Sequence, residues 1–258
     1  MRLPGVVADH LGDRRLVAVT SGQSGARVLR TDDDAPVLYL KIGEGPVAGL
    51  VADEAARAAW LMDRAPTARV VAAGVEGGTA WLLSEALPGP TLGDWIKRDR
   101  TRAAHGAVAM ARFLRALHAL PAADCPFDSS VAAWLPVARR LVVEGRVDTD
   151  DFDDDHADWS AERVLAKVEA LAHHAQGRVV VHGDFSLGNL VVGDDDRIAG
   201  CLDVGRLGVG DPYRDIVIGW RDLGGFGEAA QRAFLSEIGV GDWDVDRREL
   251  HRALDELF

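Results

Sequence analysis

Three polar residues within positions 178–205 could together catalyse a reaction, because their side chains are reactive or metal-binding and their spacing follows a known order. Asp184 follows a His-Gly pair, Asn189 comes five residues later, and Asp203 opens an Asp-Val-Gly triplet. In a kinase centre the first aspartate accepts the proton of the attacking hydroxyl, and the asparagine and second aspartate hold Mg²⁺ on nucleotide phosphates. Ordinary turn carboxylates are the alternative for any one of them. The three together favour a kinase centre with Asp184 as base and Asn189 and Asp203 as metal ligands.

Three short apolar runs must position these residues. They cover residues 179–181, 190–192 and 198–202, and a Gly-Asp-Asp-Asp turn separates the second from the third. The pattern predicts strand, loop, strand, turn and strand. The polar residues then stand at strand ends, where a ligand reaches them most easily.

A lysine and a glutamate could complete the phosphate side of such a centre. Lys41 lies inside the apolar run 37–42, and Glu54 lies in the alanine-rich segment 51–64, which we predict to be a helix. A charge inside a strand is costly unless it is paired or reaches solvent. Because the lysine strand directly precedes the helix, we expect Lys41 to pair with Glu54. A solvated charge near the helix start is the alternative for Glu54.

The segment 20–26 joins two apolar runs and consists mostly of small residues. Backbone N–H groups of such a loop can approach phosphate oxygens. The segment has neither GxGxxG nor Walker A spacing, so a plain hairpin turn is the alternative.

The pattern of apolar residues changes at Pro-Gly-Pro, residues 88–90. Residues 16–87 predict five strands and one helix. Beyond the break, apolar residues recur at helical spacing. We therefore expect an N-terminal nucleotide-binding lobe over 1–87, a C-terminal catalytic lobe over 88–258 and a hinge near 84–89. The predicted helices of the second lobe cover 91–96, 103–120, 131–143, 162–174, 228–238 and 247–258.

Three further polar residues are interpreted as structural. Asp211 precedes Pro212, which is the pattern of a helix N-cap followed by proline in the first turn. Asp215 lies in the same helix start. His118 lies on a predicted helix without a partner motif, which favours a structural histidine.

The amino-acid composition restricts the kinds of partner that the protein could bind. Lys plus Arg is 29 and Asp plus Glu is 41, so the formal net charge is −12. This charge disfavours nucleic acid and suits a cationic partner, or simply solubility. The two cysteines fit neither a disulfide framework nor a zinc site, and no apolar run reaches the ~18 residues of a membrane span. We expect a cytoplasmic protein, a monomer or weak dimer, that binds neither nucleic acid nor membrane.

Two acidic segments could meet a cationic partner. Aspartate fills seven of the eleven positions 148–158, which we call the acidic loop. A solvated loop is the plain interpretation, and EF-hand spacing is absent. Inside a kinase, the acidic loop could concentrate a polycationic acceptor. Asp255 and Glu256 near the end of the last predicted helix oppose its dipole, and a cationic ligand would relieve that repulsion.

Several segments carry a family resemblance. They are VLYLKI, DEAARAAWL, WLLSEALPG, CPFD, HGDFSLGNL, LDVGRLGVGDPYRD and LDELF, spread from about residue 16 to the end of the sequence. The chain resembles the aminoglycoside phosphotransferases, most closely those acting on the 3′-hydroxyl of kanamycin and neomycin. HGD-x₄-N with a following DxG is shared with kinases of choline, homoserine or sugars. The GRLGVGD segment, the acidic loop and the LDELF terminus favour the 3′-acting enzymes.

The resemblance implies an α+β, bilobal protein-kinase-like fold. Its N-terminal lobe would hold a five-stranded antiparallel sheet plus one helix, and its C-terminal lobe would be mainly helical. It implies ATP and Mg²⁺ as cofactors and a cationic aminoglycoside as substrate, inactivated by phosphorylation of its 3′-hydroxyl. In this sequence, it implies nucleotide contacts by Ser21, Gly22, Ser24, Lys41 and Glu54 and by the backbone of Ser84 and Ala86. The implied acceptor-binding residues are Asp151, Asp153, Asp154, Arg206, Arg221, Asp222, Asp255, Glu256 and Phe258.

Two alternative functions remain at this stage. A metabolite kinase of the same fold, acting on choline, homoserine or a thiosugar, would share the catalytic stretch but need fewer acidic groups around its acceptor. A non-catalytic nucleotide-binding module would be expected to lack one of the four central residues. All four are present: Lys41, Asp184, Asn189 and Asp203.

Overall fold

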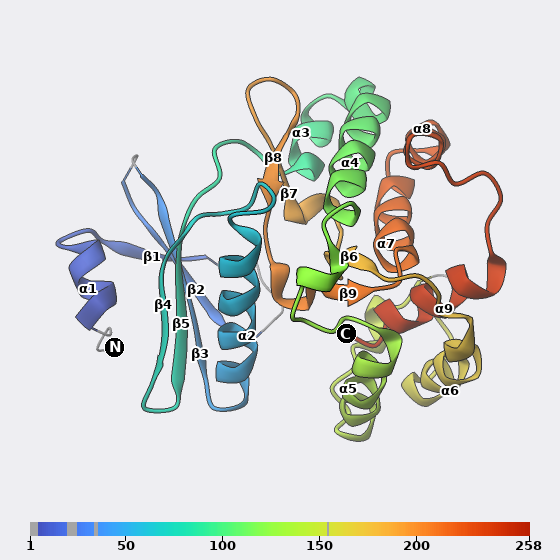
Figure 1. The fold of residues 1–258 in the computed structure, drawn as a ribbon, viewed down its shortest axis with the longest axis horizontal. Coiled ribbons are helices and arrows are strands. Elements are labelled where there is room, and N and C mark those ends of the chain that lie inside the picture. Colours follow the sequence, from blue (N-terminus) through green and yellow to red (C-terminus); the bar gives the residue numbers. More distant parts are fainter. Residues whose placement is uncertain (1–4, 20–24, 34–35, 154) are drawn as a thin grey trace. The chain divides into compact units, whose positions relative to one another are not determined.

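The computed structural model describes residues 5–19, 25–33, 36–153 and 155–258 (Figure 1). The chain divides into two compact units. The first contains residues 1–90 and 191–205, and the second contains residues 91–190 and 206–258. The sequence-based boundary placed all residues from 88 onward in the second lobe, whereas residues 191–205 group with the first unit.

The first unit is built on a five-stranded antiparallel sheet, as predicted. Its strand order is β1-β2-β3-β5-β4. A two-stranded hairpin of β7 and β8 follows later in the chain, closed by a turn in which Gly193 N–H donates to the Arg197 carbonyl at 2.8 Å. The strands are β1 (Leu16–Val19), β2 (Arg27–Thr31), β3 (Leu38–Glu44), β4 (Val70–Glu76), β5 (Thr79–Glu85), β7 (Leu190–Val192) and β8 (Ile198–Cys201).

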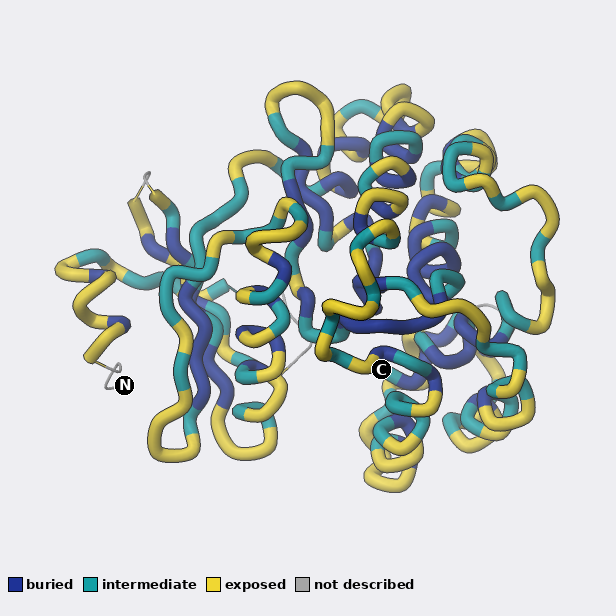
Figure 2. The backbone as a smooth tube through the Cα atoms, viewed as in Figure 1, coloured by how far each residue is buried: buried dark blue, intermediate teal, exposed yellow. Residues whose placement is uncertain are grey.

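Successive side chains of β3 point to opposite faces of the sheet, and both faces are covered by a helix. Leu38, Leu40 and Ile42 are buried on one face, in a core shared with the short helix α1 (Gly5–Leu11). The opposite face packs on helix α2 (Pro46–Leu61) through Val51 and neighbouring apolar residues. Figure 2 shows the buried centre of these strands. Lys41 alternates onto the α2 face, because successive strand residues point to opposite sides.

Helix α2 begins earlier than the sequence indicated. Gly45 takes a positive φ of 54° before it, and Pro46 occupies the first turn, where a missing N–H costs nothing. The helix ends at Leu61, three residues before the predicted end at residue 64. Glu54 therefore lies in the middle of α2, so the alternative of a solvated charge at the helix start is wrong.

The second unit is mainly helical and holds a small two-stranded sheet. Strand β6 (Val179–Val181) pairs antiparallel with β9 (Gly208–Gly210). Helix α8 packs on both α4 and α7, and α7 also packs on α9 (Figure 1). A core between α5, α6 and α9 is built on Val164, Leu250 and Leu254. The helices are α3 (Leu92–Arg98), α4 (Ala103–His118), α5 (Val131–Val143), α6 (Ala161–Leu171), α7 (Tyr213–Gly224), α8 (Glu228–Ile238) and α9 (Val245–Asp255).

Two elements were not expected from the sequence. Helix α1 is only 7 residues long and carries no capping signal strong enough to recognise. Strand β9 has glycine at both ends, and glycine does not favour strands, so the sequence pattern did not predict it. A Cβ on Gly208 or Gly210 would lie 2.9 or 2.7 Å from the carbonyl oxygens of Phe127 and Ser129, so the close backbone passage requires glycine.

Within the described ranges, none of the helices combines the length and apolar character needed to span a bilayer. Neither Cys125 nor Cys201 forms a disulfide.

Candidate active site

Lys41 holds two carboxylates in the first unit. Its Nζ lies 2.6 Å from Glu54 Oε2 and 2.7 Å from Asp203 Oδ1. Burial alone would lower the pKa of Lys41, but the attraction of Glu54 and Asp203 raises it above its usual value. Lys41 is therefore a fixed cation, and the predicted pair with Glu54 is present.

Asp203 lies two residues after strand β8 and has an unusual backbone conformation. Its φ is +52°, a left-handed value that costs a non-glycine residue about 1–2 kcal/mol. The side chain remains 55% exposed although Lys41 bonds Oδ1. Strained residues are concentrated at ligand sites. An exposed carboxylate beside a fixed ammonium has the chemistry to hold a phosphate-bound Mg²⁺.

Asp215 on helix α7 holds the start of the loop of residues 182–189 in the second unit. We call this segment the catalytic loop, because it contains the predicted base Asp184. The buried Asp215 carboxylate accepts hydrogen bonds from the backbone N–H groups of His182 and Gly183, each at 2.8 Å. His118 Nε2 lies 2.9 Å from the same carboxylate. Burial alone would raise the pKa of Asp215, but the His118 contact and backbone donors lower it. Asp215 and His118 are thus the structural residues that the sequence indicated.

Gly183 supplies the turn that presents Asp184. Its φ is +84°, and a Cβ there would collide with the backbone carbonyl of Arg206. Only glycine combines this conformation with this approach. Asp184 N–H then faces His182 Nδ1 at 3.3 Å.

Asp184 and Asn189 are brought together within the loop. Asn189 Nδ2 donates to the Asp184 carbonyl at 2.9 Å, which leaves the amide oxygen of Asn189 as an acceptor suited to a cation. The Leu187 N–H donates to Asp222 Oδ2 at 2.6 Å. Burial raises the pKa of Asp222, and the negative charge of Asp184 adds to this rise. Asp222, expected as an acceptor contact, here fixes the catalytic loop.

Arg206 and Phe258, both predicted to bind the acceptor, contact each other in the second unit. Arg206 Nη2 donates to the backbone oxygen of Phe258 at 3.3 Å, and its guanidinium lies 5.0 Å from the centre of the Phe258 ring. Trp134 meets the same ring edge-on at 5.3 Å. Phe258 is therefore held in place on two sides.

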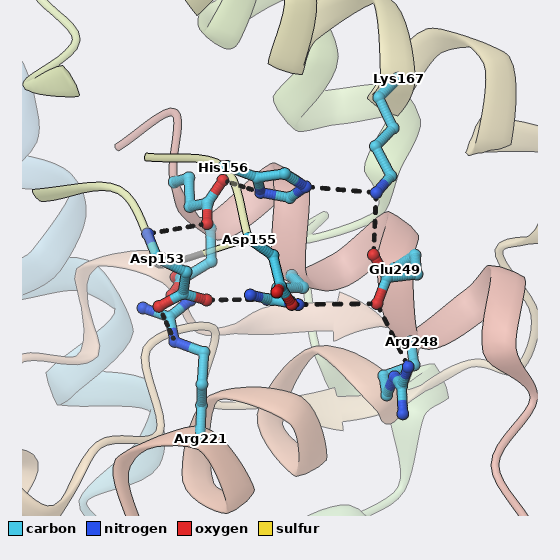
Figure 3. A network of polar contacts seen from close by, with 10 residues as sticks. Asp153, Asp155, His156, Lys167, Arg221, Arg248 and Glu249 are labelled. Atoms are coloured by element: carbon cyan, nitrogen blue, oxygen red, sulfur yellow. Dashed lines mark hydrogen bonds and ion pairs between the residues drawn. The ribbon is translucent and has the colours of Figure 1, made fainter. Parts of the chain in front are cut away.

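Two of the carboxylates expected to receive substrate amines, Asp153 and Asp255, are paired with arginines, and Figure 3 shows the pairing of Asp153. Asp153 lies 2.8 Å from Arg252 and 3.4 Å from Arg221, and Arg221 also pairs with Asp255 at 3.0 Å. Burial raises the pKa of Asp255, against the attraction of Arg221. Partly buried carboxylates need such partners, since an unpaired buried charge is costly. The acidic loop is thus tied down by internal cations.

Glu256 points into the second unit. Its side chain is fully buried, and its two oxygens bond the His156 Nδ1 and the backbone N–H of Asp153. Lys167 Nζ lies 3.2 Å from the other ring nitrogen of His156 and 2.8 Å from Glu249 (Figure 3). The expectation of Glu256 as a direct ligand for an amine is not supported by this geometry. Glu256 positions the acidic loop.

An open cleft of about 470 Å³ lies beside this network in the second unit. Asp153 and Arg221 line it, with Asp155 and Trp220 among the other residues. Asp151 is exposed in a short 3₁₀ turn. Asp154 lies outside the described residues.

The backbone N–H of Ala86, which was predicted to contact the nucleotide, is already hydrogen-bonded within the first unit. Its N–H donates to the Val37 carbonyl at 2.9 Å, so it is not a free donor for an adenine ring in this structure. Ser84 is paired inside β5, opposite Tyr39 and Val70. Ser21, Gly22 and Ser24, expected over the phosphates, lie outside the described residues.

Several site residues were not found by sequence reasoning. Arg252 lies one helical turn before Asp255, and His156 ends the run of aspartates, so spacing could have indicated both. Arg214 gave a weaker signal, a lone arginine entering an apolar helix. Burial lowers its pKa to about 10, and the positive charge of Arg206 contributes to this shift.

Together these features define a class of enzyme. A sheet carrying a Lys–Glu pair and a helical unit presenting an Asp–Asn loop are the parts of a protein-kinase-like phosphotransferase. Known proteins agree with this class. Residues 15–251 match the model of the family described as "Phosphotransferase enzyme family", and the chain belongs to this family.

The relatives are close over nearly the whole chain. An aminoglycoside 3′-phosphotransferase of Escherichia coli is 38% identical over 239 residues, which is 92% of this chain and 88% of the relative. A crystal structure of aminoglycoside-3′-phosphotransferase of type VIII superposes with a TM-score of 0.87 at 33% identity, covering 98% of this chain and 96% of the other. The phosphotransferase APH(3″)-Id from Streptomyces rimosus, in complex with ADP and streptomycin, gives a TM-score of 0.85 at 26% identity, covering 98% and 96%.

Proposed function

We propose that this protein is an aminoglycoside 3′-phosphotransferase, which transfers the γ-phosphoryl group of ATP to the 3′-hydroxyl of an aminoglycoside antibiotic and so inactivates it. The observation that carries the proposal is the catalytic loop, in which Asp215, Asp222 and Asn189 together fix the backbone around Asp184. The E. coli relative, named for this activity, supports the choice of acceptor. Because ATP is the donor, the reaction takes place in the cytoplasm.

In this proposal Asp184 accepts the proton of the attacking hydroxyl. The rigid loop places its carboxylate before the acceptor binds, and such preorganisation lowers the barrier. Lys41, held by Glu54, contacts the nucleotide phosphates. Asn189 and Asp203 would hold Mg²⁺, which when bound neutralises charge on the phosphates.

The acceptor is proposed to bind through its protonated amines. Asp151 and Asp154 of the acidic loop are the candidates for direct contact. Asp153 and Asp255 keep their arginine partners and contribute through the local field. The ring of Phe258, fixed by Arg206, would bound the acceptor on one side.

An acceptor panel in a coupled ADP-release assay tests the proposal. Kanamycin and neomycin should stimulate ADP release, whereas choline, homoserine and a thiosugar should not. The Asp184→Asn variant, as the matched blank, should bind ATP normally and lose ~10² or more in turnover. Release driven by a metabolite and not by either antibiotic would replace this proposal with a metabolite kinase.

A further inference from the structure

Arg214 on helix α7 is a buried cation with most of its hydrogen-bonding capacity unused. The residue is 3% exposed. Its Nε donates to the Gly183 carbonyl at 2.8 Å. Neither Nη1 nor Nη2 finds a hydrogen-bond partner anywhere in the part of the chain that the structure describes. The guanidinium lies 5.2 Å from the ring centre of Trp134.

Such an arrangement works against folding. A buried ion costs free energy unless its donors are paired, and an apolar side chain of similar volume is often as good or better for stability. Arg247 provides a contrast in the same unit. Its guanidinium is bonded to both oxygens of Asp211 and to the Gln176 carbonyl. Arg214 lacks comparable compensation, which indicates a role other than stability.

Charged groups from several elements act on Arg214. They are Asp184 in the catalytic loop, Arg206 beside β9, Asp215 on α7 itself and Asp255 on α9. The imidazole of His182 lies in the same loop and contacts Asp184 N–H. The cation therefore sits among the charges that surround the proposed catalytic base.

We propose that Arg214 is a positioning residue for phosphoryl transfer, which fixes the peptide between Gly183 and Asp184 and holds a positive charge beside the base. This inference rests on the proposed function. The Gly183 carbonyl and the Asp184 N–H are the two ends of one peptide group. Arg214 Nε holds the first and His182 Nδ1 holds the second. Because Gly183 has a positive φ and no side chain, its peptide planes need such a clamp.

The test compares Arg214→Met, Arg214→Lys and the control Arg247→Met. Each variant is measured for thermal unfolding and for steady-state kinetics with kanamycin at pH 7. Arg214→Met should melt at or above the wild-type temperature yet lose about tenfold or more in kcat, since small misplacements of reacting groups are this costly. Its ATP KM should change less than twofold. Arg214→Lys, which keeps the charge and a donor, should recover part of the rate. Arg247→Met should melt lower while its folded fraction keeps its kcat.

Two results would overturn the positioning role. One is wild-type kcat in Arg214→Met. The other is a joint loss of melting temperature and kcat in Arg214→Met without recovery in Arg214→Lys, which would make Arg214 a structural residue. Wild-type enzyme that does not phosphorylate any aminoglycoside would instead contradict the proposed function, and this inference with it.

Discussion

Lys41 contacts two carboxylates that come from distant parts of the sequence. Glu54 lies on α2, and Asp203 follows β8. Both Lys41 and Glu54 are largely buried, with side chains 16% and 11% exposed. A buried pair of this kind contributes little net stability but is costly to break, because the remaining charge loses its partner.

Lys41→Met should therefore lower the free energy of unfolding by about 3–5 kcal/mol, since it leaves Glu54 buried without a cation. The double variant Lys41→Met/Glu54→Gln should regain much of that stability but no activity. Urea unfolding and ADP release measure the two quantities separately. Lys97→Met, at a position 69% exposed, is the matched control and should shift stability by less than about 0.5 kcal/mol. An active double variant would show that Lys41 serves only the fold.

At the level of elements, Asp211 joins three segments of the second unit. It accepts the backbone N–H groups of Gln176 and Tyr213, and it bonds Arg247 on α9. Its carboxylate thus connects the segment before β6, the start of α7 and α9. Burial alone would raise the pKa of Asp211, but the contact with the His251 ring at 3.1 Å and the hydrogen bonds from Arg247 lower it well below the ordinary value of 3.8.

A lowered pKa in the folded state makes the ionised form stabilising above pH 3.8, and this contribution is lost as the pH falls further. At pH 7, Asp211→Asn should be less stable than wild type by about 2 kcal/mol, the scale of charged hydrogen bonds. The difference should shrink steadily below pH 3.8. Urea unfolding between pH 2.5 and 7 measures it, and the exposed Asp246→Asn is the control. A difference that stays constant with pH would contradict the assignment.

The sheet and the catalytic loop could be predicted from the sequence because their signals are local. The apolar alternation around Lys41 and the order of Asp184, Asn189 and Asp203 need no knowledge of distant partners. Spacing could have indicated Arg252 and His156 as site residues, but not their pairing with Asp153 and Glu256, because this pairing depends on how the acidic loop lies against α9. Strand β9 could not be predicted either, because its glycines are required by the close approach of the backbone of residues 127–129.

At the scale of the whole molecule, the net charge of −12 favours encounter with a polycation. We expect the kanamycin KM to rise several-fold between 50 and 500 mM NaCl, because salt screens exposed charges. The same change should be weaker in Asp151→Asn, which removes one exposed charge of the acidic loop. Steady-state kinetics at saturating ATP measures both. An identical salt response in wild type and variant would indicate that Asp151 only keeps the loop solvated.

The site of phosphorylation tests the central claim most directly. Kanamycin and an analogue that lacks only its 3′-hydroxyl should be compared as acceptors in the ADP-release assay, with ³¹P NMR of the products. We predict that kanamycin gains one phosphate at its 3′-oxygen, and that the 3′-deoxy analogue competes with kanamycin but accepts no phosphate. Phosphorylation of the analogue at a rate similar to that of kanamycin would contradict the account.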